Sequence, residues 1–237
     1  MIKFKINRLQ IVCCFLLIYS SIFSQVDTSD FGIWSSLGVD YSPIKKLKIS
    51  VEQSLRLKED AAVTDEYFTE VGLQYEIIKD FEIGGGARFI KENDNVGKKQ
   101  GYESHFRFNI DASFKYDIER FTLSHRLRYQ NKKELNLPTT EVNLPKETVR
   151  FKTDLEYNIR KWALDPEFSV ELFSGLENVQ QVRELNLDKI RLTFGTDYKF
   201  KNFGKFGIYY RYEENIIKYF KNENLHILGF SYSYSIN

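Results

Sequence analysis

Charged side chains that could bind ions or take part in catalysis recur at every second position of several segments of this chain. Both signs are interleaved among them. A guanidinium group pairs bidentately with a carboxylate, so one interpretation is a network of ion pairs that fills a confined interior. The other is an anion-binding or substrate-guiding passage. A selective passage usually shows a surplus of one sign along its path, so the mixed signs favour the network. The residues are Arg56, Glu70, Arg88, Arg107, Asp111, Arg126, Arg128, Arg150, Asp154, Glu156, Glu171, Arg191, Arg211 and Glu213.

Three histidines raise the question of an enzyme. His125 and His226 fall on the apolar side of their segments, whereas His105 falls on the polar side, beside Glu103. The neighbouring Ser104 points to the opposite face, because successive residues of a strand alternate in direction. Nucleophilic catalysis needs a nucleophile, a base and an orienting group within hydrogen-bond reach of one another, and these residues assemble no such set. The sequence therefore predicts no enzymatic activity. The alternative is an enzyme that acts on lipid or peptide at one end of the structure through His105 and Glu103.

The sequence predicts no cofactor and no metal site. Both cysteines, Cys13 and Cys14, lie in the N-terminal segment, so the rest of the chain offers no thiolate ligand. The stretch GGGARF (84–89) lacks the lysine and the following helix of a phosphate-binding loop, and it fits a bend or a close approach within a strand. The 34 basic and 33 acidic residues nearly balance, which gives no indication of nucleic-acid binding.

The charged side chains need elements that hold them on one face. In LKISVEQSLRLK (47–58), apolar residues such as Leu47 and Ile49 alternate with polar ones such as Lys48 and Glu52. A period of two is typical of a β-strand, whose successive side chains point to opposite faces. We expect the apolar face of this segment to contact lipid and the polar face to line a lumen. Eleven segments show this period: 31–41, 47–58, 66–77, 81–90, 102–116, 121–130, 148–157, 167–174, 189–199, 205–213 and 225–236.

The N-terminal segment has the order of a secretory signal peptide. A basic head precedes the apolar run IVCCFLLI (11–18), and small residues follow up to Ser24. The run is too short for a transmembrane helix, which needs about 20 apolar residues. We therefore expect residues 1–24 to be removed by cleavage before Gln25, and residues 25–237 to form one β-barrel domain.

Connections and aromatic residues indicate a membrane barrel. Short connections follow the first, third, fifth and ninth segments and longer polar ones follow the even-numbered segments, so one end has tight turns and the other long loops. A ring of aromatic residues near the tight turns matches the girdle of a transmembrane barrel at the membrane–water interface. A soluble sandwich explains the alternation, but neither the ring nor strands of ten or more residues, the length that a tilted strand needs to cross a bilayer. The ring comprises Tyr41, Tyr75, Phe81, Tyr116, Phe121, Tyr157, Trp162, Tyr198 and Phe206.

The predicted fold is all-β: a closed antiparallel transmembrane β-barrel with tight periplasmic turns and long extracellular loops. Closure is required because unpaired backbone groups cannot be left in hydrocarbon. Bacterial single-chain barrels have an even number of strands, whereas the pattern shows eleven segments. Either residues 25–31 add a strand or the segment 31–41 lies partly outside the wall. The sequence therefore leaves both ten and twelve strands open.

Four stretches also resemble a known family: DFGIW (30–34), RLRYQNK (126–132), YNIRKWALDPEFSVELF (157–173) and IRLTFGTDYKF (190–200). They are similar to uncharacterised outer-membrane proteins of Gram-negative bacteria, catalogued as domain of unknown function 2490. The resemblance implies a β-barrel in the outer membrane and carries no activity with it.

The function that these observations predict is that of an outer-membrane barrel with a structural, binding or limited transport role. A small-solute channel is a further alternative. We expect export to the periplasm, insertion with the help of the barrel-assembly machinery, and contact with outer-membrane lipid. The sequence identifies no physiological ligand.

Overall fold

The computed structural model describes residues 29–95, 100–137, 143–179, 182–201, 203–216 and 224–236. The expected signal peptide and the cleavage site before Gln25 lie outside these residues. Among the described residues, no helix is long and apolar enough to cross a membrane.

Each of the eleven alternating segments forms a β-strand in this part of the chain. Alternation of β-branched or aromatic residues with polar ones suits a strand that is apolar on one face only. Most strands are longer than the pattern alone predicts. They are β1 (Ser29–Ile44), β2 (Leu47–Lys58), β3 (Val63–Ile78), β4 (Phe81–Asp94), β5 (Gly101–Ile118), β6 (Phe121–Leu135), β7 (Lys146–Tyr157), β8 (Leu164–Val179), β9 (Val182–Phe200), β10 (Gly204–Asn215) and β11 (Asn224–Ile236).

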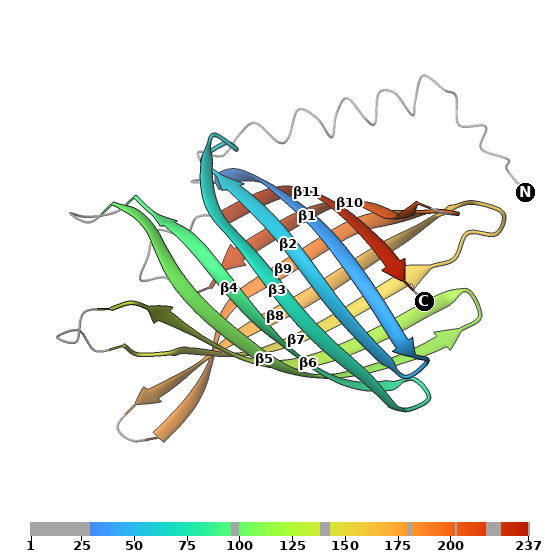
Figure 1. The fold of residues 1–237 in the computed structure, drawn as a ribbon, viewed down its shortest axis with the longest axis horizontal. Coiled ribbons are helices and arrows are strands. Elements are labelled where there is room, and N and C mark those ends of the chain that lie inside the picture. The colour runs from blue at the N-terminus through green and yellow to red at the C-terminus, as the bar shows by residue number, and fades with distance from the viewer. Residues whose placement is uncertain are drawn as a thin grey trace, which may run out of the picture.

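The eleven strands close into one barrel in which sequence neighbours pair antiparallel (Figure 1). The first and last strands complete the wall as a parallel pair, from Ser29 opposite Asn224 to Tyr41 opposite Ile236. Strand direction alternates around the wall, so an odd number of strands must bring two parallel strands together at the closure. The prediction of a closed, mainly antiparallel all-β barrel of about 10–12 strands is confirmed. The expectation of an even number of strands was wrong, because the wall has eleven and therefore contains one parallel pair. The segment 31–41 lies fully in the wall, because β1 pairs along its length with β2 and β11.

The two ends of the barrel differ. Two residues connect β1 to β2, β3 to β4, and β5 to β6, and these turns lie at the same end as the chain terminus marked C in Figure 1. In two of these turns one residue has a positive φ: the second residue of the β3–β4 turn, Asp80, at 68°, and the first residue of the β5–β6 turn, Glu119, at 55°. The opposite end carries the longer connections after β4, β6 and β10. A long loop expected after residue 174 is instead a hairpin extension of β8 and β9. Its described residues beyond Gly175, 176–179 and 182–187, pair only between these two strands.

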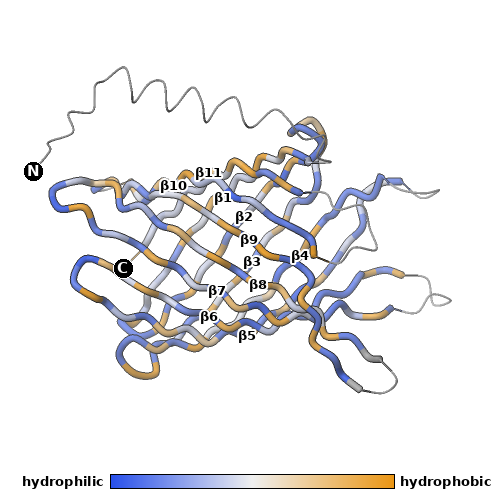
Figure 2. The backbone as a smooth tube through the Cα atoms, turned by 180° about the vertical axis from the view of Figure 1, so that it is seen from behind, coloured by the Kyte–Doolittle hydropathy of each residue, from blue (hydrophilic) through white to orange (hydrophobic). Residues whose placement is uncertain are grey.

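The two faces of the wall differ in chemistry. Figure 2 shows hydrophobic and hydrophilic residues alternating along the strands. On β5, for example, Phe108 and Ile110 are exposed on the outer face, whereas Arg107, Asn109 and Asp111 are buried on the inner face. The buried part of this barrel is therefore its charged lumen, and its apolar residues lie mainly outside.

Candidate functional site in the lumen

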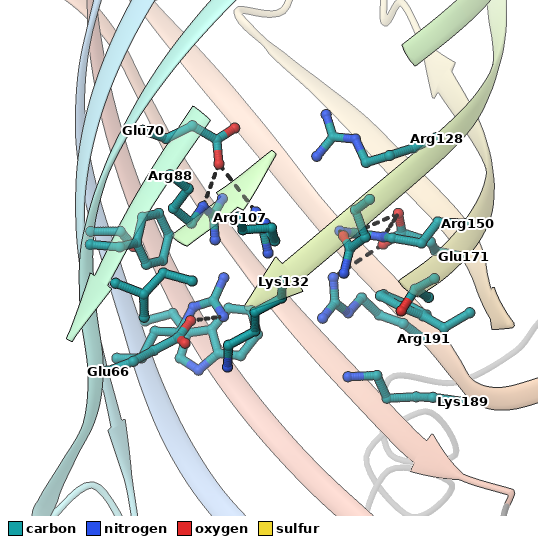
Figure 3. A pocket seen from close by; sticks show the side chains of 18 of the residues that line it. Glu66, Glu70, Arg88, Arg107, Arg128, Lys132, Arg150, Glu171, Lys189 and Arg191 are labelled. Atoms are coloured by element: carbon teal, nitrogen blue, oxygen red, sulfur yellow. Dashed lines mark hydrogen bonds and ion pairs between the residues drawn. The ribbon is translucent and has the colours of Figure 1, made fainter. Parts of the chain in front are cut away.

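The lumen contains a cavity of about 600 Å³ that is lined by residues of all eleven strands. Figure 3 shows the charged side chains that converge on it from two parts of the wall. One group surrounds Glu70 on β3, and the other surrounds Glu171 on β8.

Glu171 accepts hydrogen bonds from three arginines. Its Oε1 atom lies 2.7 Å from Arg150 Nη2 and 3.0 Å from Arg126 Nη2, and its Oε2 atom lies 3.1 Å from Arg191 Nη1. The three arginines come from β7, β6 and β9, so this one carboxylate on β8 joins four strands. We call Glu171 with these three arginines the Glu171 cluster. Its carboxylate is only 3% exposed.

The Glu171 cluster continues through Glu213 on β10. Arg191 Nε donates to Glu213 Oε1 at 2.6 Å, and Lys189 Nζ donates to Glu213 Oε2 at 2.7 Å. The ring of Phe173 lies 4.4 Å from the guanidinium carbon of Arg150 and 4.6 Å from that of Arg191. Such cation–π contacts, together with the ion pairs, fix the orientation of the planar guanidinium groups.

Glu70 accepts hydrogen bonds from two arginines of the neighbouring strands. Arg88 Nε on β4 donates to it, and Arg107 Nη2 on β5 donates to the same oxygen at 3.1 Å. Arg88 also stacks on Phe68, with its guanidinium carbon 3.5 Å from the ring centroid. We call Glu70, Arg88 and Arg107 the Glu70 cluster.

Three more of the expected arginines complete the lining. Arg128 makes a bidentate pair with Asp111, at 2.6 and 2.7 Å. Arg56 bonds Glu66 and lies 3.7 Å over the ring of Trp34. Arg211 differs, because its Nε atom donates to the hydroxyl of Thr193 at 3.0 Å rather than to a carboxylate.

Two of the expected carboxylates lie apart from these clusters. Asp154 pairs with Lys152, and Glu156 lies opposite Glu167 in the pairing of β7 with β8. The sequence pattern thus predicted the inner face for all of the expected charged residues. It did not distinguish those in the Glu171 and Glu70 clusters from those outside them.

The histidine of the enzyme alternative lies in the lumen without a nucleophile beside it. His105 Nε2 is 3.5 Å from a carboxylate oxygen of Glu92 and 3.5 Å from one of Glu103. Ser104 faces outward, where its hydroxyl accepts a hydrogen bond from Lys91 at 2.7 Å. In the part of the chain that the structure describes, no group of three or more His, Cys, Asp or Glu side chains could hold a metal ion.

The aromatic ring expected near the tight turns lies on the outer face. Most of its members are exposed, and Phe121 and Tyr157 lie side by side with ring centroids 4.8 Å apart. A second group of outward aromatic residues, which the sequence pattern did not single out, lies toward the long-loop end. It includes the pairs Tyr67 with Tyr102, at 5.6 Å, and Phe89 with Phe106, at 5.0 Å.

Sequence reasoning also missed the aromatic residues of the lumen. Trp34, Phe68 and Phe173 are buried on the inner face, where arginines stack on them. The signal was present, because Trp34 alternates with outward-facing Ile33 and Ser35. Aromatic residues were expected on the outer face, whereas these three support the arginines of the lumen.

The family model described as "Protein of unknown function (DUF2490)" matches residues 31–222 of the chain. No curated protein matches the chain significantly.

Proposed function

The chain belongs to the DUF2490 family of proteins of unknown function, and we propose that it is a non-enzymatic β-barrel of the bacterial outer membrane whose lumen is filled by ion-paired side chains. Its role is then structural or in binding, rather than free passage of solutes.

The distribution of apolar side chains supports the membrane location. Large apolar residues such as Leu37, Ile110 and Phe194 are exposed on the outer face, on strands from every part of the wall. A soluble monomer rarely exposes apolar patches larger than a few hundred Å². A bilayer would cover these residues, and the closed wall leaves no strand edge unpaired in hydrocarbon.

The spacing of the two aromatic groups supports the same location. Phe106 and Tyr116 lie on the outer face of β5, ten residues apart. At about 3.3 Å per residue this distance is about 33 Å along the strand. With a strand tilt of about 40°, it corresponds to about 25 Å of height, which is the usual height of the apolar band between two aromatic girdles.

The burial of the lumen arginines is the main support for the proposal that solutes do not diffuse freely through the lumen. In a water-filled pore the inward side chains would be accessible to solvent. Here Arg107, Arg150 and Arg191 are all less than 10% exposed. All three pack against carboxylates of neighbouring strands, and Arg150 and Arg191 also pack against the ring of Phe173. Each is also part of an ion pair, which restricts its motion.

Fractionation and detergent dependence test the location. We expect the chain to be recovered in the outer-membrane fraction, to begin at or near Gln25, and to require detergent or lipid to remain folded. A folded, monodisperse sample without detergent would contradict the proposal. A mature chain that still begins with Met1 would contradict the expected processing.

Planar-bilayer recording tests the closed lumen. We expect no stable conductance steps from the wild type. Trp34→Ala removes the indole on which Arg56 stacks and should introduce conductance, whereas Trp162→Ala, at the exposed tight-turn end, should not. Stable steps from the wild type would instead favour the small-solute channel.

Lipid turnover in reconstituted vesicles tests the enzyme alternative. We expect no turnover by the wild type, and therefore no change on His105→Ala. Turnover that the substitution abolishes would contradict the proposal and assign a catalytic role to His105 and its neighbour Glu103.

A further inference from the structure

The cavity in the lumen has a surplus of cations. Of the residues that the structure describes, twelve Lys and Arg side chains and five Asp and Glu side chains line it. Five further carboxylates pair with these cations. When they are counted too, the cations still outnumber the carboxylates. The five are Glu92, Asp111, Asp154, Glu167 and Glu213.

The surplus is concentrated in one row across four neighbouring strands. Arg88 is the register partner of Arg107, Arg107 of Lys132, and Lys132 of Lys146. We call these four residues the cationic row. Like charges directly opposite each other on one face of a sheet destabilise it. A row of four is therefore unfavourable unless negative charge is supplied beside it.

The carboxylates of the protein supply only part of that charge. Glu70 is shared between Arg88 and Arg107, and Glu92 bonds Lys132. The Nη1 atom of Arg88 and the Nε atom of Arg107 are buried and have no hydrogen-bond partner among the described residues. Arg88 and Arg107 are themselves only 7% and 9% exposed. Buried donors of this kind normally have a partner, since leaving one unpaired costs about 1–3 kcal/mol.

Farther along β6 and β7, the lining presents a similar arrangement. Arg128 and Arg150 are register partners, and Arg126 of the Glu171 cluster has a buried Nε atom without a hydrogen-bond partner among the described residues. Stacking of Arg88 on Phe68 and of Arg150 on Phe173 holds these guanidinium groups in place. Little conformational entropy would be lost when such pre-oriented groups bind a ligand.

We propose that the cavity between the Glu70 cluster and the Glu171 cluster binds a phosphate-type oxyanion, with the cationic row and Arg126 as its main contacts. Planar guanidinium forks match the oxygen geometry of a phosphate group, and several of them in one pocket favour a ligand with two or more negative charges. The cavity of about 600 Å³ has room for pyrophosphate or for a small phosphorylated molecule. The inference names a ligand class for the lumen of the proposed barrel and rests on that lumen being ion-paired rather than open.

Calorimetric titration of the folded, processed chain in detergent tests this site. The probes are inorganic phosphate and pyrophosphate, each compared with chloride at matched ionic strength. We expect both phosphates to bind, pyrophosphate more tightly, and the affinity to fall as salt is added. A second arm adds phosphatidic acid in mixed micelles. Binding of the soluble probes alone identifies a water-soluble ligand, and binding of phosphatidic acid alone identifies a lipid headgroup.

Three variants locate the binding. Arg107→Gln should weaken phosphate binding about tenfold or more, because it removes a charged hydrogen-bond donor. Lys146→Gln, at the exposed end of the cationic row, should weaken it several-fold with little risk to folding. Arg120→Gln removes the same charge from an exposed tight turn and should leave binding unchanged.

Folding is followed in parallel by the shift in gel mobility between boiled and unboiled samples. A folded wild type that binds neither phosphate nor phosphatidic acid better than chloride would overturn the proposed site while leaving the proposed barrel intact. Equal affinity in the wild type and the folded Lys146→Gln and Arg107→Gln variants would also overturn it. Should Arg107→Gln fail to fold, Lys146→Gln decides the question alone.

Discussion

Replacing Glu171 by Gln tests whether one carboxylate holds the arginines of the lumen. The amide keeps the size of the side chain but removes the charge that Arg126, Arg150 and Arg191 share. Arg191 retains Glu213, at 2.5 Å, so the loss falls mainly on Arg126 and Arg150. Leaving a buried charge without its partner costs about 3–5 kcal/mol. We expect Glu171→Gln to lower the free energy of unfolding by about this amount.

Urea denaturation of the barrel in lipid vesicles measures this loss. Asp197→Asn is the matched control, because it removes the same charge from the exposed pair of Asp197 with Lys205, where about 0–1 kcal/mol is expected. A double variant that also carries Arg150→Gln should recover part of the stability, since it removes one of the uncompensated cations. A loss at Glu171 no larger than at Asp197 would refute the reasoning, because it would mean that the arginines are solvated and need no shared carboxylate.

Two further predictions concern the faces of the wall. Ile110, on the outer face of β5, is 61% exposed, and its replacement by lysine should destabilise the barrel in vesicles by about 2–4 kcal/mol. Leu185, near the tip of the β8–β9 hairpin, is 57% exposed, and its replacement by lysine should cost less than about 1 kcal/mol. Equal effects at the two positions, measured by the same denaturation, would contradict a membrane around the wall. Inside the lumen, Gly229→Ala would place a Cβ against the ring of Tyr209 and should cost about 1–3 kcal/mol, whereas Gly38→Ala, whose Cβ would have its nearest neighbour at 3.7 Å, should be tolerated. Similar melting temperatures for the two alanine variants would show that the Tyr209 ring moves freely.

The pattern of the sequence determined the faces of the strands. Ile110 lies outside and Arg107 inside because successive side chains of any strand point to opposite faces, and this property belongs to the single strand. The tight turns and the outward aromatic ring followed from the same local signals. The extension of β8 and β9 was missed because polar residues such as Asn186 and Asp188 read as a loop, whereas pairing between the two strands holds them extended.

Only the tertiary structure decided how the wall closes and which charges meet. The parallel pairing of β1 with β11 depends on where the two ends of the sheet come together, and the side-chain pattern of either strand is the same for parallel and antiparallel partners. The stagger between neighbouring strands likewise sets which residues stand opposite each other. It brings Arg126, Arg150 and Arg191 to Glu171, and it aligns Arg88 with Arg107, although all of these residues share the same alternating pattern. Alternation fixes the direction of each side chain, whereas its partners are fixed by the alignment of all the strands around the barrel.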